Sequence, residues 1–195
     1  MFFEFELIKK LELLKQEALL KSLCSIHKLN GYITGEIDIS NIDFRHESHI
    51  HSLKKIINKY QISPNLIRLS LNEQKLSQSK KQTFKALNEL SELGFKISIK
   101  YFASKLSFIY LETLPIESIQ IPSQIIDNIK HSKHNTNAIT AIIDLAKIYN
   151  TTVIAKGIDN SITFNKIIEL GCNIGQGMYI EKPLPLELLL NKINK

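Results

Sequence analysis

Cysteine, arginine and long apolar runs are all scarce in this 195-residue sequence. Its two cysteines, Cys24 and Cys172, stand far apart and outside any metal-ligand spacing, so the sequence indicates neither a disulfide framework nor a zinc site. No apolar run approaches the roughly 20 residues that a membrane helix needs. The first residues also lack the basic-then-apolar order of a signal peptide. We therefore expect a cytoplasmic protein that does not contact a membrane.

Positive charge exceeds negative charge, but almost all of it comes from lysine. There are 25 Lys and Arg against 19 Asp and Glu, a formal net charge of +6, and the only arginines are Arg45 and Arg68. Guanine edges and phosphates are usually recognised by the bidentate arginine side chain. Because the lysines are also scattered among acidic residues, the composition favours a solvated surface and argues against direct nucleic-acid binding.

The proportions of hydrophobic residues (44%) and charged residues (23%) are typical of a folded protein and not of a disordered one. No linker or low-complexity tract interrupts the sequence, so we predict one domain over residues 1–195. In its amino-terminal part, 1–30, apolar residues recur at helical spacing and end at Asn30-Gly31. The remainder, 31–195, is predicted to consist of strands and helices in alternation.

Short runs rich in β-branched residues predict the strands, at 32–39, 66–71, 95–101, 118–121 and 151–155. Helical patterns separate and follow them, at 47–60, 80–93, 104–114, 136–149, 160–171 and 185–193. This alternation is typical of a parallel sheet with helical crossovers. The strands look like continuous apolar runs, which predicts a sheet with both faces buried. Because no glycine-rich phosphate loop occurs, we expect a barrel-like closure with functional side chains at the carboxyl ends of strands.

Four segments in the second half of the sequence carry a family resemblance. They are LGFKISIKYF (93–102), LETLPIESIQI (111–121), AKIYNTTVIAKGID (146–159) and LGCNIGQGMYIEKPLP (170–185). In order and spacing they resemble the DDFG, LKID, AEGVE and QGY…KPLP segments of the EAL domain, the bacterial cyclic di-GMP phosphodiesterase family. The resemblance covers nearly the whole chain and implies an α/β, TIM-barrel-like EAL fold.

The opening of that fold is expected to be absent. The string Glu17-Ala18-Leu19-Leu20-Lys21 is similar to the family's EALLR signature, but it lies in a helical pattern and too close to the first predicted strand, so we interpret it as a coincidence. We therefore predict an amino-terminally shortened, incomplete barrel. Its open edges would have to be covered by the first helix, a second subunit in a homodimer or a partner protein, with Phe2, Phe3 and Phe5 as candidate anchors.

The resemblance also identifies positions that correspond to the family's site residues. Family members hold two divalent cations, which activate a water molecule for attack on the phosphodiester. Positions with a retained or similar residue are Asp38, Glu73, Asp159 and Gln176. Substituted positions are Lys100, Tyr101, Gln120, Pro122 and Lys156. Because a lysine repels metal ions, the resemblance implies a degenerate EAL domain with no catalytic residue, no metal and no cofactor.

The retained polar residues are open to two interpretations. They are relics of a ligand site, or they cap strand ends and pair with the new Lys100 and Lys156. We expect the second, since carboxylates that face lysines form local ion pairs in place of metal contacts. No base or oxyanion partner is evident for Tyr101 or Tyr179, so both are expected to be packing residues.

The resemblance further implies that the protein acts through protein contact. Degenerate EAL proteins bind a transcription regulator and keep it from DNA, so we expect a partner of this kind and control of motility, adhesion or virulence genes. The alternative is a cyclic di-GMP receptor that binds without hydrolysis. We rank it second, because most of the family's nucleotide contacts are substituted, and an active phosphodiesterase third.

Overall fold

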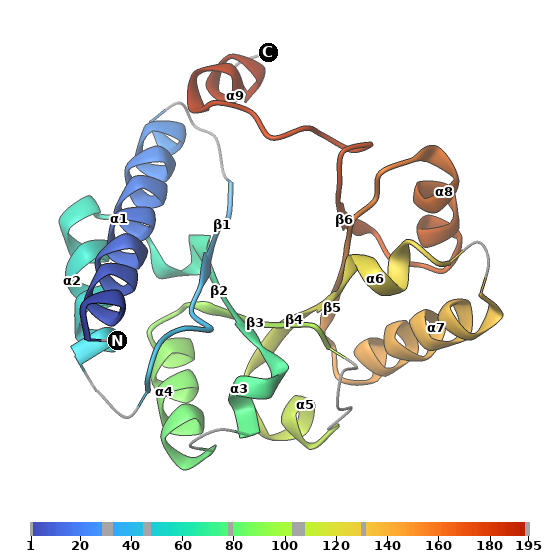
Figure 1. The fold of residues 1–195 in the computed structure, drawn as a ribbon, viewed down its shortest axis with the longest axis horizontal. Coiled ribbons are helices and arrows are strands. Elements are labelled where there is room, and N and C mark those ends of the chain that lie inside the picture. Colours follow the sequence, from blue (N-terminus) through green and yellow to red (C-terminus); the bar gives the residue numbers. More distant parts are fainter. Residues whose placement is uncertain are drawn as a thin grey trace.

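The computed structural model describes residues 2–28, 33–44, 48–77, 80–102, 108–129 and 132–193. Six strands form one parallel sheet in sequence order: β1 (Gly35–Asp38), β2 (Ile67–Asn72), β3 (Lys96–Lys100), β4 (Ile116–Ile121), β5 (Thr152–Lys156) and β6 (Ile174–Gln176). Each strand pairs with its neighbours in the sequence. The sheet curls into part of a barrel that is open between β1 and β6 (Figure 1).

Helices cover the outer side of this curved sheet (Figure 1). They are α1 (Phe2–His27), α2 (Ser48–Tyr60), α4 (Lys80–Glu92), α5 (Ile109–Thr113), α7 (Lys133–Ile148) and α8 (Ser161–Glu169). The short helices α3 (Glu73–Ser77) and α6 (Ser123–Ile126) follow the carboxyl ends of β2 and β4, and a 3-10 turn, Pro64–Leu66, precedes β2. The last helix, α9 (Leu186–Ile193), lies at the open side of the barrel (Figure 1).

Local sequence signals explain several helix ends. Ser132 and Asn160 begin α7 and α8 by accepting a hydrogen bond from the backbone N–H three residues on, at 3.2 and 3.0 Å. Gly94 and Gly171 follow α4 and α8 with φ angles of 97° and 90°, in the left-handed region that favours glycine. The crossovers through α4, α7 and α8 therefore have a defined start or stop.

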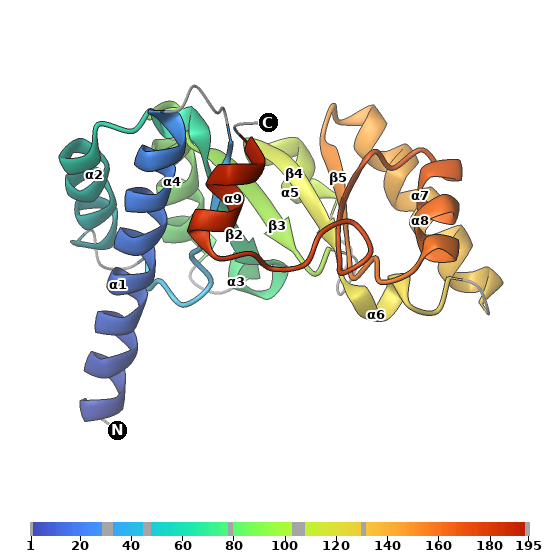
Figure 2. The same cartoon turned by 90° about the horizontal axis from the view of Figure 1, so that it is seen from above.

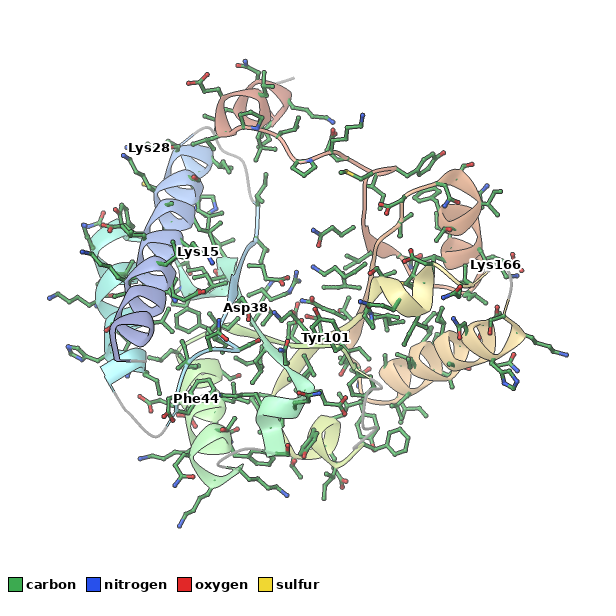
Figure 3. The ribbon with its side chains drawn as sticks, in the orientation of Figure 1. Lys15, Lys28, Asp38, Phe44, Tyr101 and Lys166 are labelled. Atoms are coloured by element: carbon green, nitrogen blue, oxygen red, sulfur yellow. The ribbon has the colours of Figure 1, made fainter. Side chains whose placement is uncertain are left out.

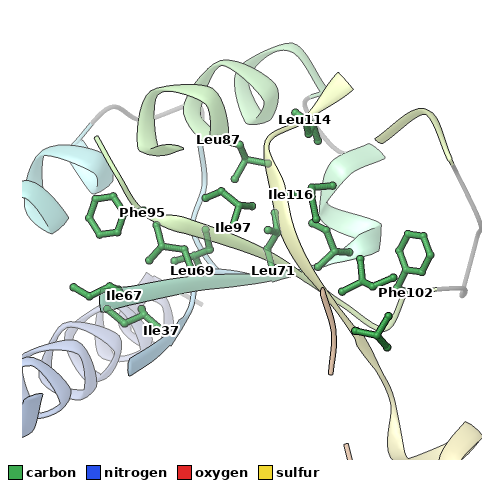
Figure 4. Close-up of a cluster of buried hydrophobic side chains, with 14 of the residues drawn as sticks. Ile37, Ile67, Leu69, Leu71, Leu87, Phe95, Ile97, Phe102, Leu114 and Ile116 are labelled. Carbon is green, nitrogen blue, oxygen red and sulfur yellow. The ribbon is translucent and has the colours of Figure 1, made fainter. Parts of the chain in front are cut away.

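The two faces of the sheet differ in polarity: both are buried in the middle of the sheet, as predicted, but only the outward face is apolar. In β2 the sequence Ile67-Arg68-Leu69-Ser70-Leu71-Asn72 alternates strictly, and successive strand side chains point to opposite faces. The outward face packs against the helices and includes Ile37, Leu69, Leu71, Ile97, Ile99, Ile119, Ile121 and Val153 (Figure 4). The inward face carries Glu36, Asp38, Arg68, Ser70, Asn72, Ser98, Lys100, Ser118, Gln120, Lys156 and Gln176. The inside of the partial barrel is therefore mainly polar, with Ile154 and Ile174 as apolar residues in register with Gln120.

The predicted alternation of strands and helices is confirmed, with shifted boundaries. The strand expected at 32–39 is the shorter β1, and residues 29–32, where the first helix was expected to end, lie outside the described residues. Of the helix expected at 104–114, the structure describes α5, and 103–107 lie outside its description. The short elements β6, α3 and α6 were not predicted. The EALLR-like string is helical, as expected.

No helix in the described ranges is both long enough and apolar enough to cross a membrane.

Candidate functional site

Polar side chains from four strands converge inside the curved sheet, near the carboxyl ends of the strands. They border a cavity of about 250 Å³. Figure 3 labels Asp38 and Tyr101 in this region. The lining residues are Glu36, Lys100, Tyr101, Gln120, Pro122, Ser123, Gln124 and Lys156. Because neighbouring parallel strands end at the same edge, residues far apart in the sequence meet here.

Lys100, the last residue of β3, forms an ion pair with Asp38 at the end of β1. Asp38 Oδ1 also accepts hydrogen bonds from Ser40, from Oγ at 2.6 Å and from the backbone N–H at 2.9 Å. Burial raises the pKa of Asp38, but the hydrogen bonds from Lys100 and Ser40 outweigh this effect and hold the pKa below its ordinary value of 3.8. Asp38 is thus an anion that is already paired with a cation.

Lys156, the last residue of β5, lies between two partners. Its Nζ donates a hydrogen bond to Gln176 Oε1 on β6 and lies 3.9 Å from Glu36 Oε1 on β1. Burial lowers the pKa of Lys156, and the cations of Arg68 and Lys100 add to this effect, whereas the Glu36 carboxylate opposes it. Several positive charges therefore share the inside of the sheet.

Gln120 completes the cluster from β4. Its Nε2 donates hydrogen bonds to Glu36 Oε2 and to Ser98 Oγ, both at 3.0 Å, and Ser118 Oγ donates to Ser98 Oγ at 2.9 Å. Gln120, Ser98 and Ser118 are all buried. The amide fixes one carboxylate oxygen of Glu36, while the other faces Lys156.

Two of the four retained positions bind the lysines of this cluster. Asp38 binds Lys100, and Gln176 binds Lys156. Asp159, three residues beyond β5, instead accepts a hydrogen bond from the backbone N–H of Met178 at 2.9 Å. Glu73 is buried at the start of α3.

Sequence reasoning missed one central residue and misjudged another. Glu36 was not singled out, although the alternation in Gly35-Glu36-Ile37-Asp38 places it on the same face as Asp38. Tyr101 was expected to be a packing residue, but it is about half exposed, borders the cavity and has a φ of 54°. Tyr179 is also half exposed and contacts the Phe164 ring, with centroids 5.4 Å apart.

The side chains at the strand ends do not fit the pair of divalent cations that the resemblance implies. Hard cations prefer several oxygen ligands, whereas here the ammonium groups of Lys100 and Lys156 stand beside the carboxylates of Asp38 and Glu36. Among the described residues, no three His, Cys, Asp or Glu side chains are grouped so that they could hold one metal ion. No step through a metal is therefore derived for this site.

Comparison with known proteins agrees with the resemblance. The sequence profile of the EAL domain family matches residues 2–183. The signaling protein YkoW of Bacillus subtilis is 32% identical over 159 residues, which are 80% of this chain and 20% of YkoW. The cyclic di-GMP phosphodiesterase PdeA of Borreliella burgdorferi is 28% identical over 184 residues, 94% of this chain and 28% of PdeA. The chain thus spans less than a third of either relative.

Solved structures share the fold. The PaMucR phosphodiesterase in its c-di-GMP complex has a TM-score of 0.89 at 22% identity, covering 95% of this chain and 76% of that chain. The EAL enzyme Bd1971 in its cGMP-bound form has a TM-score of 0.90 at 26% identity, covering 97% of this chain and 53% of that chain. With a profile match over residues 2–183 and the parallel half-barrel shared with solved EAL structures, the chain belongs to the EAL domain family.

Proposed function

We propose that the chain is a catalytically inactive EAL domain that acts by binding another protein, a transcription regulator. The proposed lack of catalytic activity rests on one observation, the position of Lys100 and Lys156. Both stand at strand ends where the resemblance places metal-binding carboxylates, and they lie beside Asp38 and Glu36. The carboxylates of Asp38 and Glu36 therefore already have cations of the protein itself as neighbours.

Coulomb's law indicates how strongly a lysine in place of a carboxylate opposes the binding of a metal ion. A divalent cation about 4 Å from one ammonium group is repelled by about 8 kcal/mol at an effective dielectric constant of about 20. That is as large as the whole binding free energy of a micromolar ligand, about 8 kcal/mol. Two lysines in the cavity therefore oppose the two-metal chemistry by which a phosphodiesterase activates water.

A hydrolysis assay tests the catalytic half of the proposal. Pure protein is incubated with cyclic di-GMP and Mn²⁺ or Mg²⁺, and the linear dinucleotide is measured by chromatography, with the PaMucR phosphodiesterase as positive control. We expect no product. Turnover that requires the metal and is lost in Glu73→Ala would overturn the proposal.

The partner class comes from the resemblance to degenerate EAL regulators. We expect a tagged chain to retain a DNA-binding regulator from lysate of the source bacterium, with or without added cyclic di-GMP, and the EAL domain of PaMucR to retain none. The purified regulator should then bind its DNA more weakly in gel-shift assays when the chain is added. Recovery of a partner without any effect on DNA binding would contradict the regulatory role.

A non-hydrolysing cyclic di-GMP receptor is the second candidate, because of the donors around the cavity. Lys100, Gln120 and Lys156 all line it, and each could contact a phosphate oxygen. Calorimetry with cyclic di-GMP in the absence of divalent cations distinguishes the candidates. Binding that is lost in Lys156→Ala and kept in Lys166→Ala, a control lysine on α8, would favour the receptor. No binding to the wild-type chain would leave the protein-contact function.

A further inference from the structure

The cavity inside the sheet combines a partly buried positive charge with an exposed aromatic side chain. Lys156 and Tyr101 both line it, together with Pro122 and Ser123. Figure 2 shows α3 and α6 on the same side of the sheet, where the strands that carry these residues end. The cavity volume of about 250 Å³ is below the roughly 300 to 1,000 Å³ of most ligand pockets. Only a small molecule could therefore be enclosed here.

The positive charge of Lys156 is only partly compensated. Its Nζ donates a hydrogen bond to Gln176 Oε1, which is a neutral acceptor, and Glu36 Oε1 at 3.9 Å is too far away for a hydrogen bond. Burial lowers the pKa of Lys156, and two neighbouring cations, Arg68 and Lys100, add to this effect. The surroundings thus disfavour the ammonium form, and a single negative charge beside Lys156 would favour it.

Tyr101 has a backbone conformation that a tyrosine rarely adopts. Its φ of 54° lies in the left-handed region. Both neighbours hold it there, because Lys100 is paired with Asp38, and Phe102 is buried and donates its backbone N–H to the carbonyl oxygen of Gln120 at 3.3 Å. The Tyr101 side chain nevertheless remains 48% exposed. Backbone strain that the surrounding structure enforces in this way is concentrated at sites that hold a ligand.

We propose that this cavity binds a small aromatic carboxylate, with the carboxylate beside the Lys156 ammonium group and the ring against Tyr101. A carboxylate supplies one negative charge, which matches the one ammonium group that is only partly compensated, and it accepts charge-assisted hydrogen bonds. A planar ring can make the offset-stacked or edge-to-face contact that a tyrosine ring prefers. The proposal rests on the proposed function, because it requires a cavity that holds no metal ion.

Calorimetric titration of the full chain with benzoate, in the absence of divalent cations, tests the proposal. We expect a dissociation constant in the millimolar range or below, as the small size of the ligand allows. Benzamide keeps the ring without the charge, and acetate keeps the charge without the ring. Each should bind at least about tenfold more weakly than benzoate. Equal binding of the three compounds, or no binding of benzoate at millimolar concentrations, would overturn the proposal.

Single substitutions locate the bound benzoate. Lys156→Ala and Tyr101→Ala should each weaken its binding at least about fivefold. Tyr101→Phe, which keeps the ring, and Lys166→Ala, which changes a lysine on α8 outside the cavity lining, should bind benzoate like the wild type. Unchanged affinity in Lys156→Ala would place benzoate elsewhere and overturn the proposed site.

Nuclear magnetic resonance of the wild-type chain gives an answer even if a variant fails to fold. The chain has six tyrosines, and Tyr101→Phe assigns the ring resonances of Tyr101. We expect benzoate to shift these resonances, because its ring lies against the tyrosine ring. Saturation with benzoate without a shift at Tyr101 would overturn the proposed contact.

The hydrolysis assay separates failure of the ligand from failure of the proposed function. Turnover of cyclic di-GMP that requires a metal would overturn both, because the cavity would then hold metal ions. Absence of turnover together with absence of benzoate binding would overturn the aromatic ligand alone.

Discussion

Glu36 on β1 and Gln120 on β4 are linked by a hydrogen bond of 3.0 Å, although β2 and β3 lie between their strands in the sheet. Lys156 on β5 approaches the other oxygen of Glu36 at 3.9 Å, and Asp38 on β1 is paired with Lys100 on β3. All these contacts pass across the inside of the curved sheet. They join strands that share no backbone hydrogen bonds, and they therefore favour the curled shape of a sheet whose two edges do not meet.

The substitution Glu36→Ala should lower the free energy of unfolding by about 1 to 3 kcal/mol. The reason is that Gln120, which is 2% exposed, would lose the carboxylate that accepts from its Nε2, and Lys156 would lose a neighbouring anion. Urea unfolding of the wild type, both single variants and Glu36→Ala/Gln120→Ala measures the coupling. Glu169→Ala, which removes a surface partner of Lys166, should cost less than about 1 kcal/mol. An equal loss in both glutamate variants would contradict the role of Glu36.

The pair between Asp38 and Lys100 should make stability depend on acid pH. Because the pKa of Asp38 is lower in the folded chain than its ordinary 3.8, the charged form stabilises the fold above that pH. This contribution is lost as the pH falls through the folded-state pKa. The Asp38 side chain is 50% exposed, so we expect at most about 1 kcal/mol.

Denaturation curves of the wild type and Asp38→Asn between neutral pH and pH 2 check this prediction. The wild type should be the more stable protein at neutral pH, and the two should converge in acid. A difference that persists unchanged at the lowest pH would show that ionisation of Asp38 contributes nothing.

Reversing the two lysine charges should create affinity for metal ions. The double substitution Lys100→Asp/Lys156→Glu would gather four carboxylates around the cavity, together with Asp38 and Glu36. We expect millimolar Mn²⁺ to raise its thermal midpoint by several degrees, because a ligand that binds only the folded state stabilises it. The wild type and Lys166→Asp, a charge change on the surface, should show no shift. A shift of equal size in the wild type would contradict the repulsion argument.

A side chain at Gly177 should destabilise the fold. The cause is a steric clash with neighbouring backbone atoms and not the backbone conformation of Gly177. A Cβ there would lie 2.1 Å from the carbonyl oxygen and 2.3 Å from the nitrogen of Ile158. Since these are backbone atoms, Gly177→Ala should cost about 2 kcal/mol or more. Gly171 has a positive φ but nothing within 4 Å, so Gly171→Ala should cost only about 1 kcal/mol. Urea midpoints give the comparison, and a larger effect at Gly171 would refute the argument.

Local patterns in the sequence were sufficient for the order of the elements, because hydrophobic periodicity and glycine stops act within each segment. The polarity of the inward face was not predicted, since Ser98 was counted with an apolar run although it lies on that face beside Ser70. The positions of Lys100, Gln120 and Lys156 at strand ends could be predicted from the family segments. The alternation within β1 would have placed Glu36 on the face of Asp38, but its partners could not be predicted, because they come from strands that meet it only when the sheet curls.

The strand order of the sheet has a consequence for how such a domain varies. Every described strand pairs only with its immediate predecessor and successor, as in proteins built from stacked repeats. A unit of strand and helix can therefore be gained or lost at either edge while the backbone pairings of the others remain intact. Removal of an outer unit does, however, take a partner away from the charged contacts between distant strands. These contacts therefore limit how many units such a domain can lose.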